Sequence, residues 1–169
     1  GPRALVIDAR VVNTGSGIHN PAGPVAVLCA GNTLAHASGG RDFAGFHCLP
    51  PLGESHLVEL TRGTATSEFT AGATAHFFHA IGMHVVWVGD TPGLVLGRIV
   101  CQLINEAAFA AQEGVATPAD IDKGVRLGLN YPRGILAWAD AIGLDQVLAT
   151  LDALREFGGD RYRAAPLLR

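Results

Sequence analysis

The sequence lacks the features that mark several simple functional classes. Its 12 Lys and Arg residues are scattered and its net charge is −3, which leaves no basic block for nucleic acid or an anionic membrane. No apolar run reaches bilayer-spanning length, and residues 3–8 are too short for the apolar core of a signal peptide. We therefore expect a cytoplasmic protein that binds neither nucleic acid nor a membrane.

Metal-binding patterns are also missing. The three cysteines, Cys29, Cys48 and Cys101, lie inside apolar segments without metal-ligand spacing, so we expect reduced thiols in the core. His76 and His79 are three residues apart, but no third ligand accompanies them. No metal site is predicted.

The first half of the chain contains apolar runs of strand length. Hydrophobic residues make up 49% of the chain against 16% charged, a composition typical of a well-buried globular protein. Because the runs show little alternation, they predict strands buried on both faces of a mostly parallel sheet. The expected strands cover residues 4–9, 24–30, 43–48, 57–61 and 85–88, with residues 31–41 as turn and loop.

One helix is predicted within this half. Thr66-Ser67-Glu68 has the form of an N-cap followed by an acid in the first turn. The helix would end at Gly82. Its apolar face is predicted to carry Phe69, Ala73, Phe77 and Ala80.

After the turn Asp90-Thr91-Pro92-Gly93 the apolar period becomes helical. A long helix is expected up to Gly114, a second over 119–127 after Thr117-Pro118, and two more near 135–142 and 144–157. No element is expected for 161–169. The predicted domains are therefore an α/β part, 1–90, and a helical part, 91–169. The apolar stripe of the long helix is predicted to comprise Leu96, Ile99, Val100, Leu103, Ala107, Ala110 and Ala111.

Gly15-Ser16-Gly17 invites comparison with a phosphate-binding loop. A dinucleotide fingerprint must leave a strand and enter a helix, so that the pyrophosphate meets the helix N-terminus. Here Ile18-His19-Asn20-Pro21 follows, which does not open such a helix. The sequence therefore disfavours a nucleotide site in this loop.

Several separated motifs, in order, resemble the L-3-hydroxyacyl-CoA dehydrogenase family from about Val25 to Arg169. Phe43-Ala44-Gly45-Phe46-His47 resembles the strand that ends on the catalytic His, and Leu57-Val58-Glu59-Leu60 the strand of its Glu partner. Asp90-Thr91-Pro92-Gly93 matches the interdomain hinge. The helical domain is matched by Ile104-Asn105-Glu106-Ala107, Glu113-Gly114-Val115-Ala116, Asp120-Ile121-Asp122-Lys123, Leu127-Gly128-Leu129, Tyr131-Pro132 and Gly143-Leu144-Asp145.

The resemblance implies a fold and a chemistry. The fold is α/β plus all-α: a truncated Rossmann-like, mostly parallel sheet, then a helical C-terminal domain of the 6-phosphogluconate/3-hydroxyacyl-CoA dehydrogenase type. In the family a 3-hydroxyacyl-CoA is oxidised by NAD. His47 would be the general base and Glu59 its orienting carboxylate, with Asn32 and Thr33 at the substrate. An imidazole backed by a carboxylate suits this role. The alternative is a buried His–Glu pair kept for packing.

Three departures from the family pattern affect this site. Leu34 stands where the family has a substrate-binding Ser, Gly97 where it has an Asn, and Pro50-Pro51 where it has Asn-Pro. Each lost hydrogen-bonding group costs about 2–4 kcal/mol of transition-state stabilisation. The Gly-rich NAD half of the family is also not expected in this segment, since only about 24 residues precede the matched region. NAD is expected in the parent enzyme and not on this segment.

Three hypotheses follow. The chain is similar to the second, C-terminal copy in long bacterial hydroxybutyryl-CoA dehydrogenases of the phenylacetate-degradation type. It is then a non-catalytic copy that packs or dimerises through its helical domain, as a homodimer or against another part of its own chain. Alternatively, it is a catalytic module served by an NAD domain from elsewhere. The third hypothesis is a module that only binds acyl-CoA.

Overall fold

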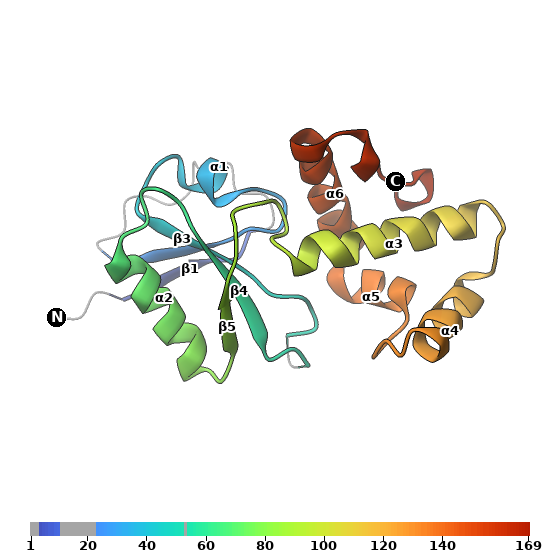
Figure 1. The fold of residues 1–169 in the computed structure, drawn as a ribbon, viewed down its shortest axis with the longest axis horizontal. Helices are drawn as coiled ribbons and strands as arrows, with labels where there is room; N and C mark the ends of the chain where they lie inside the picture. The colour runs from blue at the N-terminus through green and yellow to red at the C-terminus, as the bar shows by residue number, and fades with distance from the viewer. Residues whose placement is uncertain (1–3, 11–22, 53) are drawn as a thin grey trace. The chain divides into compact units, whose positions relative to one another are not determined.

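The computed structural model describes residues 4–10, 23–52 and 54–169. They form two compact units, Gly1–Gly97 with a β-sheet and Arg98–Arg169 with helices (Figure 1). The predicted α/β-plus-helical class is confirmed. The domain boundary at residue 90 stays a prediction, and Gly15-Ser16-Gly17 lies outside the described residues.

The sheet of the first unit has five strands in chain order, β1-β2-β3-β4-β5. Neighbouring strands run parallel except β3 and β4, which are antiparallel, so the predicted mostly parallel sheet is confirmed. The strands are β1 (Val6–Asp8), β2 (Val25–Leu28), β3 (Phe43–His47), β4 (Leu57–Arg62) and β5 (His84–Trp87).

Both faces of the central strands are buried, as their continuous apolar runs predict. Val25 and Val27 on β2 join a core cluster with Leu34 and Leu94 on one face. Ala26 and Leu28 join a second cluster with Phe78 on the other. Because successive side chains point to opposite faces, β2 contributes to both clusters.

The segment expected to be a polar turn and loop contains a short helix, α1 (Leu34–Ser38), so that prediction was wrong. Thr33 is its N-cap and accepts a hydrogen bond from the His36 amide at 3.1 Å. Asp90 supplies two more acceptors, for the amides of Leu34 and Ala35. Five residues are too few to show a helical period, which is why the pattern was missed.

Helix α2 (Glu68–Ala80) begins after Ser67, within the predicted Thr66–Glu68 start, but its buried face was predicted wrongly. Phe69 is 62% exposed, and the buried positions are Thr70, Ala71, Thr74 and Phe78. The helix packs on strands β2 to β5. Small residues and one phenylalanine on the buried face allow α2 to pack closely on the sheet. The prediction was wrong because it placed the largest apolar side chains on that face.

Helix α3 (Leu96–Gln112) starts directly after a tight turn. Gly93 and Leu94 both have positive φ angles, 69° and 47°. Leu94 is nevertheless fully buried in the cluster that contains Leu34. A non-glycine residue in the left-handed region costs of order 1–3 kcal/mol. Burial of the Leu94 side chain offsets part of that cost.

The predicted stripe on α3 is only partly correct. Val100 and Ala107 are buried, but Ile99 is 51% exposed. The buried face also includes Cys101, Ile104 and Ala108. The remaining helices agree with the predictions to within a residue or so: α4 (Pro118–Gly128), α5 (Ile135–Ile142) and α6 (Leu144–Gly158).

The C-terminal segment has structure that was not predicted. It forms two short 3₁₀ turns, η1 (Asp160–Tyr162) and η2 (Pro166–Leu168). Asn105 of α3 holds the backbone between them: its side chain donates to the Arg163 carbonyl at 3.0 Å and accepts from the Ala165 amide at 2.7 Å. The hydrogen bonds of one buried amide side chain thus hold this segment in place. The segment itself has no periodic apolar pattern from which the turns could be predicted.

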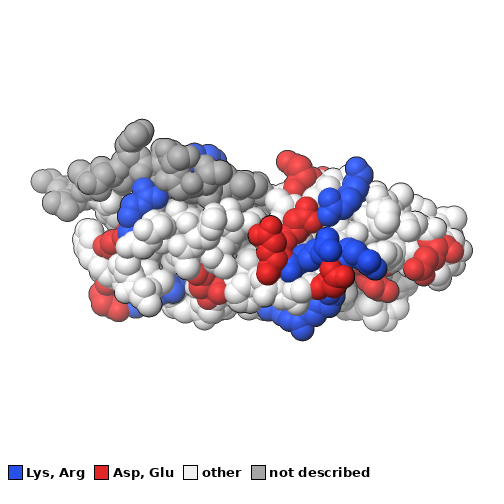
Figure 2. Space-filling model, turned by 90° about the horizontal axis from the view of Figure 1, so that it is seen from above, with Lys and Arg blue, Asp and Glu red and all other residues white. Residues whose placement is uncertain are grey.

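The described surface carries charges of both signs (Figure 2), and the cysteines are free thiols. None of the described helices is long and apolar enough to cross a membrane. On the face seen in Figure 2, acidic and basic side chains of the described residues are interspersed. Cys29 and Cys101 are buried free thiols, and Cys48 is half-buried.

Candidate functional site

The sheet brings together the two residues predicted to carry catalysis. His47, the last residue of β3, is the register partner of Glu59 on the antiparallel strand β4. Both side chains are buried, His47 at 1% and Glu59 at 3% exposure. A directly opposed pair in an antiparallel ladder has β-carbons about 4.5–5.5 Å apart, so the two side chains are neighbours.

Glu59 makes its hydrogen bonds to the start of α3. Its carboxylate accepts from the Val95 amide at 3.1 Å and from the Leu96 amide at 3.0 Å. These two N–H groups belong to the helix end, where four amides have no partner within the helix. Burial raises the pKa of the Glu59 carboxyl, and the two amide hydrogen bonds lower it. The carboxylate therefore caps α3.

The imidazole of His47 is buried without a partner for one ring nitrogen. Within the described residues, Nδ1 has no hydrogen-bond partner. Burial lowers the pKa of His47 from 6.5 to about 4. The ring is thus neutral at physiological pH. A general base works best with a pKa near the operating pH, supported by an acceptor behind the ring, and neither condition is met in this conformation.

Gly97 lies against the ring of His47. A β-carbon at this position would stand 2.8 Å from Cε1 and 2.9 Å from Nε2. Such distances are below van der Waals contact, so any other residue at 97 requires a shift. The imidazole therefore fills the space that a side chain at 97 would take.

The residues predicted to contact substrate have structural partners. The Thr33 hydroxyl accepts from the His36 amide as the N-cap of α1. Asn32 immediately precedes it and is half-buried. Leu34 points into the core, where it is fully buried. The replacement of a polar residue by Leu34 therefore adds to the apolar core of this unit.

The helix N-termini in this unit do not suit a pyrophosphate. Dinucleotide sites place the pyrophosphate at a helix N-terminus, where amides and the helix dipole favour negative charge. Asp90 occupies the start of α1, and Asp42 binds the N-cap residue Ser67 of α2 at 2.7 Å. At the starts of α1 and α2, carboxylates therefore already lie where a pyrophosphate would have to approach.

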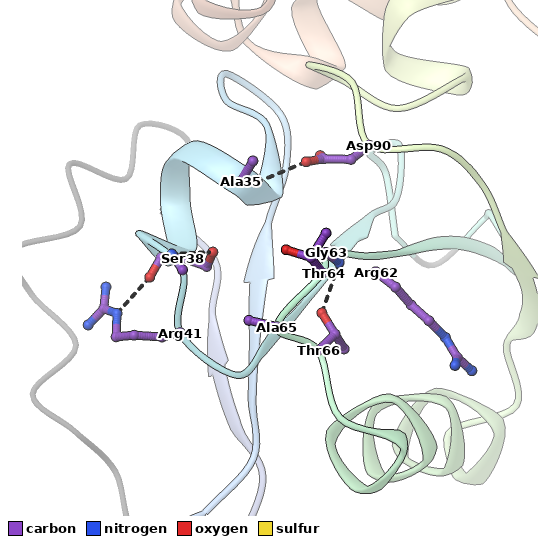
Figure 3. A pocket seen from close by; sticks show the side chains of 10 residues that line it. Ala35, Ser38, Arg41, Arg62, Gly63, Thr64, Ala65, Thr66 and Asp90 are labelled. Atoms are coloured by element: carbon purple, nitrogen blue, oxygen red, sulfur yellow. Dashed lines mark hydrogen bonds between the residues drawn. The ribbon is translucent and has the colours of Figure 1, made fainter.

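A cavity of about 320 Å³ lies beside Asp90. In Figure 3 the side chains of Arg41 and Arg62 extend away from its centre, and Asp90 is directed toward Ala35 of α1. His47, Glu59, Asn32 and Thr33 do not line it. The lining residues are Ala35, Ser38, Gly40, Arg41, Arg62, Gly63, Thr64, Ala65, Thr66 and Asp90.

The described residues contain no group of three His, Cys, Asp or Glu side chains that could hold a metal. His76 and His79 are both exposed on α2. Sequence reasoning missed the helix-capping roles of Glu59 and Asp90. The acidic residue of the hinge motif was the available signal for Asp90, because an acid near a helix start is a common cap.

Comparison with known proteins identifies the class and then the family. The described residues have an α/β unit followed by a helical unit. Residues 93–169 match the family model described as 3-hydroxyacyl-CoA dehydrogenase, C-terminal domain. The chain belongs to the L-3-hydroxyacyl-CoA dehydrogenase family.

Individual relatives show the same likeness. A probable 3-hydroxybutyryl-CoA dehydrogenase of Bacillus subtilis is 44% identical over 126 residues, which cover 74% of this chain and 44% of that protein. The structure of (S)-3-hydroxybutyryl-CoA dehydrogenase from Ralstonia eutropha is 38% identical with a TM-score of 0.75, covering 86% of this chain and 53% of that one. For a 3-hydroxybutyryl-CoA dehydrogenase of Escherichia coli the values are 29% identity, TM-score 0.79, and 96% and 34% coverage. The chain thus spans between about a third and about a half of the length of these three relatives.

Proposed function

We propose that the chain is a segment of an NAD-dependent 3-hydroxyacyl-CoA dehydrogenase and is itself a non-catalytic packing copy. In the parent enzyme a 3-hydroxyacyl-CoA would be oxidised to the 3-ketoacyl-CoA in the cytoplasm. The observation that carries the proposal is the division of the His–Glu pair. The Glu59 carboxylate caps α3, while Nδ1 of His47 has no partner among the described residues.

In this arrangement His47 is poorly placed to take a proton from the substrate hydroxyl. NAD, when bound by the parent enzyme, would accept the hydride. The base would have to take the hydroxyl proton, and a ring that is 1% exposed has no open path to a substrate oxygen. The positions Leu34 and Gly97 offer no hydrogen-bonding side chain. The remaining binding roles of Asn32 and Thr33 stay part of the proposal.

The helical unit supplies the packing surface in this proposal. Large apolar side chains are exposed on it, including Val115 at 72%, Leu127 at 76% and Leu129 at 62%. We take these side chains as the candidate interaction surface, because large exposed apolar surfaces mark interaction sites. The partner would be a second copy or another part of the parent chain. Sedimentation measurements on the wild-type chain and on a Leu127→Lys variant test this. The variant should associate more weakly than the wild type.

A turnover assay tests the catalytic part. The chain, mixed with NAD and 3-hydroxybutyryl-CoA, should form no NADH. Turnover that is present in the wild type and absent in His47→Gln would overturn the proposal. His79→Gln, on an exposed histidine of α2, is the matched control.

A second candidate is a catalytic module that uses NAD bound elsewhere in the parent. It is favoured by the direct register pairing of His47 with Glu59. Tight NAD binding by the chain in calorimetry would support it. Binding of acetoacetyl-CoA without turnover would instead indicate the acyl-CoA-binding module.

A further inference from the structure

The placement of Gly97 has a consequence for the accessibility of His47. We propose that Gly97 is a positioning residue: the absence of a side chain at 97 keeps the imidazole of His47 buried against the first turn of α3, and any side chain there expels the ring. The inference deepens the proposed function, since it names what keeps the candidate base out of reach, but its test does not depend on turnover.

The backbone at Gly97 is fixed from two directions. The preceding amides of Val95 and Leu96 are bound by Glu59, and the Gly93 amide donates to the Cys29 carbonyl at 2.8 Å. Leu94 is fully buried between these contacts. A new β-carbon at 97 therefore meets a backbone that is tied to β4 and to Cys29, the residue after β2, and that resists displacement.

The imidazole is the mobile partner in this contact. It is the far end of a side chain with two rotatable bonds, and its Nδ1 has no hydrogen bond among the described residues. Outside the helix's own backbone, the three atoms nearest to the added β-carbon all belong to this ring. The ring, and not the helix, should move when a side chain is added.

Histidine-specific acylation with diethyl pyrocarbonate, mapped by mass spectrometry, reads out the position of the ring. Among the described residues, five other histidines are exposed and serve as internal references: His36, His56, His76, His79 and His84. In the wild type His47 should react roughly tenfold or more slowly than these, because it reacts only after local opening. In Gly97→Asn and Gly97→Ala its rate should rise into their range.

The matched control is Gly72→Ala, because a β-carbon at Gly72 on α2 meets nothing within 4 Å. This variant should leave His47 protected. Fast reaction of His47 in the wild type, or continued protection in a folded Gly97→Asn or Gly97→Ala variant, would overturn the inference. The turnover assay tests the proposed function separately, since an inactive wild-type chain with a reactive His47 would contradict only the inference.

A second-site variant covers the case in which both substitutions prevent folding. His47→Ala removes the ring that the added β-carbon would meet. If Gly97→Ala fails to fold because of this clash, the double variant His47→Ala/Gly97→Ala should fold. A double variant that remains unfolded, judged by circular dichroism, would count against the inference, because the clash would then lie elsewhere.

Discussion

The carboxylate of Glu59 accepts a hydrogen bond from the amide of Leu96, 37 residues further along the chain, at 3.0 Å. The same arrangement recurs in this fold. Asp90 binds two amides at the start of α1, and Asp122 binds two at the start of α5. Carboxylates from distant segments thus satisfy helix amides and oppose the positive end of the helix dipole. These hydrogen bonds tie the first turns of α1, α3 and α5 to the segments that carry the three carboxylates.

Removing the cap on α3 should destabilise the chain. Glu59→Ala leaves the Val95 and Leu96 amides without their acceptor in a buried position, which costs about 1–3 kcal/mol. Glu59→Gln keeps one acceptor and should cost less. Urea denaturation measures both. Glu68→Ala removes an exposed partner of Arg62 and should change the free energy of unfolding by less than about 1 kcal/mol. Equal effects of the Glu59 and Glu68 variants would contradict the capping role.

The cap on α5 depends on a glycine. A β-carbon at Gly134 would overlap Cγ of Asp122, so Gly134→Ala must displace the carboxylate from the Leu136 and Ala137 amides. We expect a loss of about 1–3 kcal/mol. Gly124→Ala is the control, because its β-carbon meets nothing within 4 Å in the interior of α4. That variant should instead gain about 0.5–1 kcal/mol. A neutral Gly134→Ala variant would show that the cap is dispensable.

The sequence predicts the elements that carry a repeating pattern. Continuous apolar runs located all five strands, and Thr117-Pro118-Ala119-Asp120 located the start of α4. Both signals are local, so they are visible without the rest of the fold. The pairing of His47 with Glu59 was expected from the family resemblance and not from a local pattern.

What the sequence did not predict depends on contacts between distant segments. The Leu96 amide that Glu59 binds follows a turn in which Leu94 has a positive φ of 47°, and a leucine gives no signal of that conformation. The burial of the His47 ring depends on the space at Gly97. In the sequence, Gly97 is visible only as a position that lacks the side chain of the family motif, and the sequence does not show what fills the space. The C-terminal turns depend on one buried amide, that of Asn105.

The Asn105 contacts should control the order of the C-terminal segment. Asn105→Ala leaves the Ala165 amide and the Arg163 carbonyl without their partner, at a cost of about 1–3 kcal/mol. Hydrogen exchange at the Ala165 amide should accelerate. Gln112→Ala removes an exposed hydrogen bond to the Leu167 amide of the same segment and should have a smaller effect on stability. Unchanged exchange at Ala165 in Asn105→Ala would contradict this role.

Acid should destabilise the chain through His47. Its pKa is about 4 in the folded chain and 6.5 as the ordinary value, so the unfolded chain takes up the proton more readily. The contribution of the neutral ring is complete above pH 6.5 and is lost as the pH falls toward 4. Between about pH 8 and about pH 5 the loss should be about 2 kcal/mol. Glu59 acts in the opposite direction, because burial raises its pKa.

Urea denaturation at the two pH values measures this effect, with His47→Gln as the comparison. The glutamine does not titrate, so the difference between wild type and variant isolates the contribution of His47. The variant should lose less stability on acidification than the wild type. An equal loss in both proteins would show that other groups cause it.

The ionisation of His47, followed by nuclear magnetic resonance of its ring nitrogens, tests the central claim most directly. A ring buried against Gly97, with Glu59 committed to α3, should remain neutral down to about pH 4. Its titration should move toward 6.5 in Gly97→Ala, where the ring is expelled. A wild-type ring that titrates at or above 6.5, with Nδ1–H bonded to a carboxylate, would contradict the account and favour a working general base.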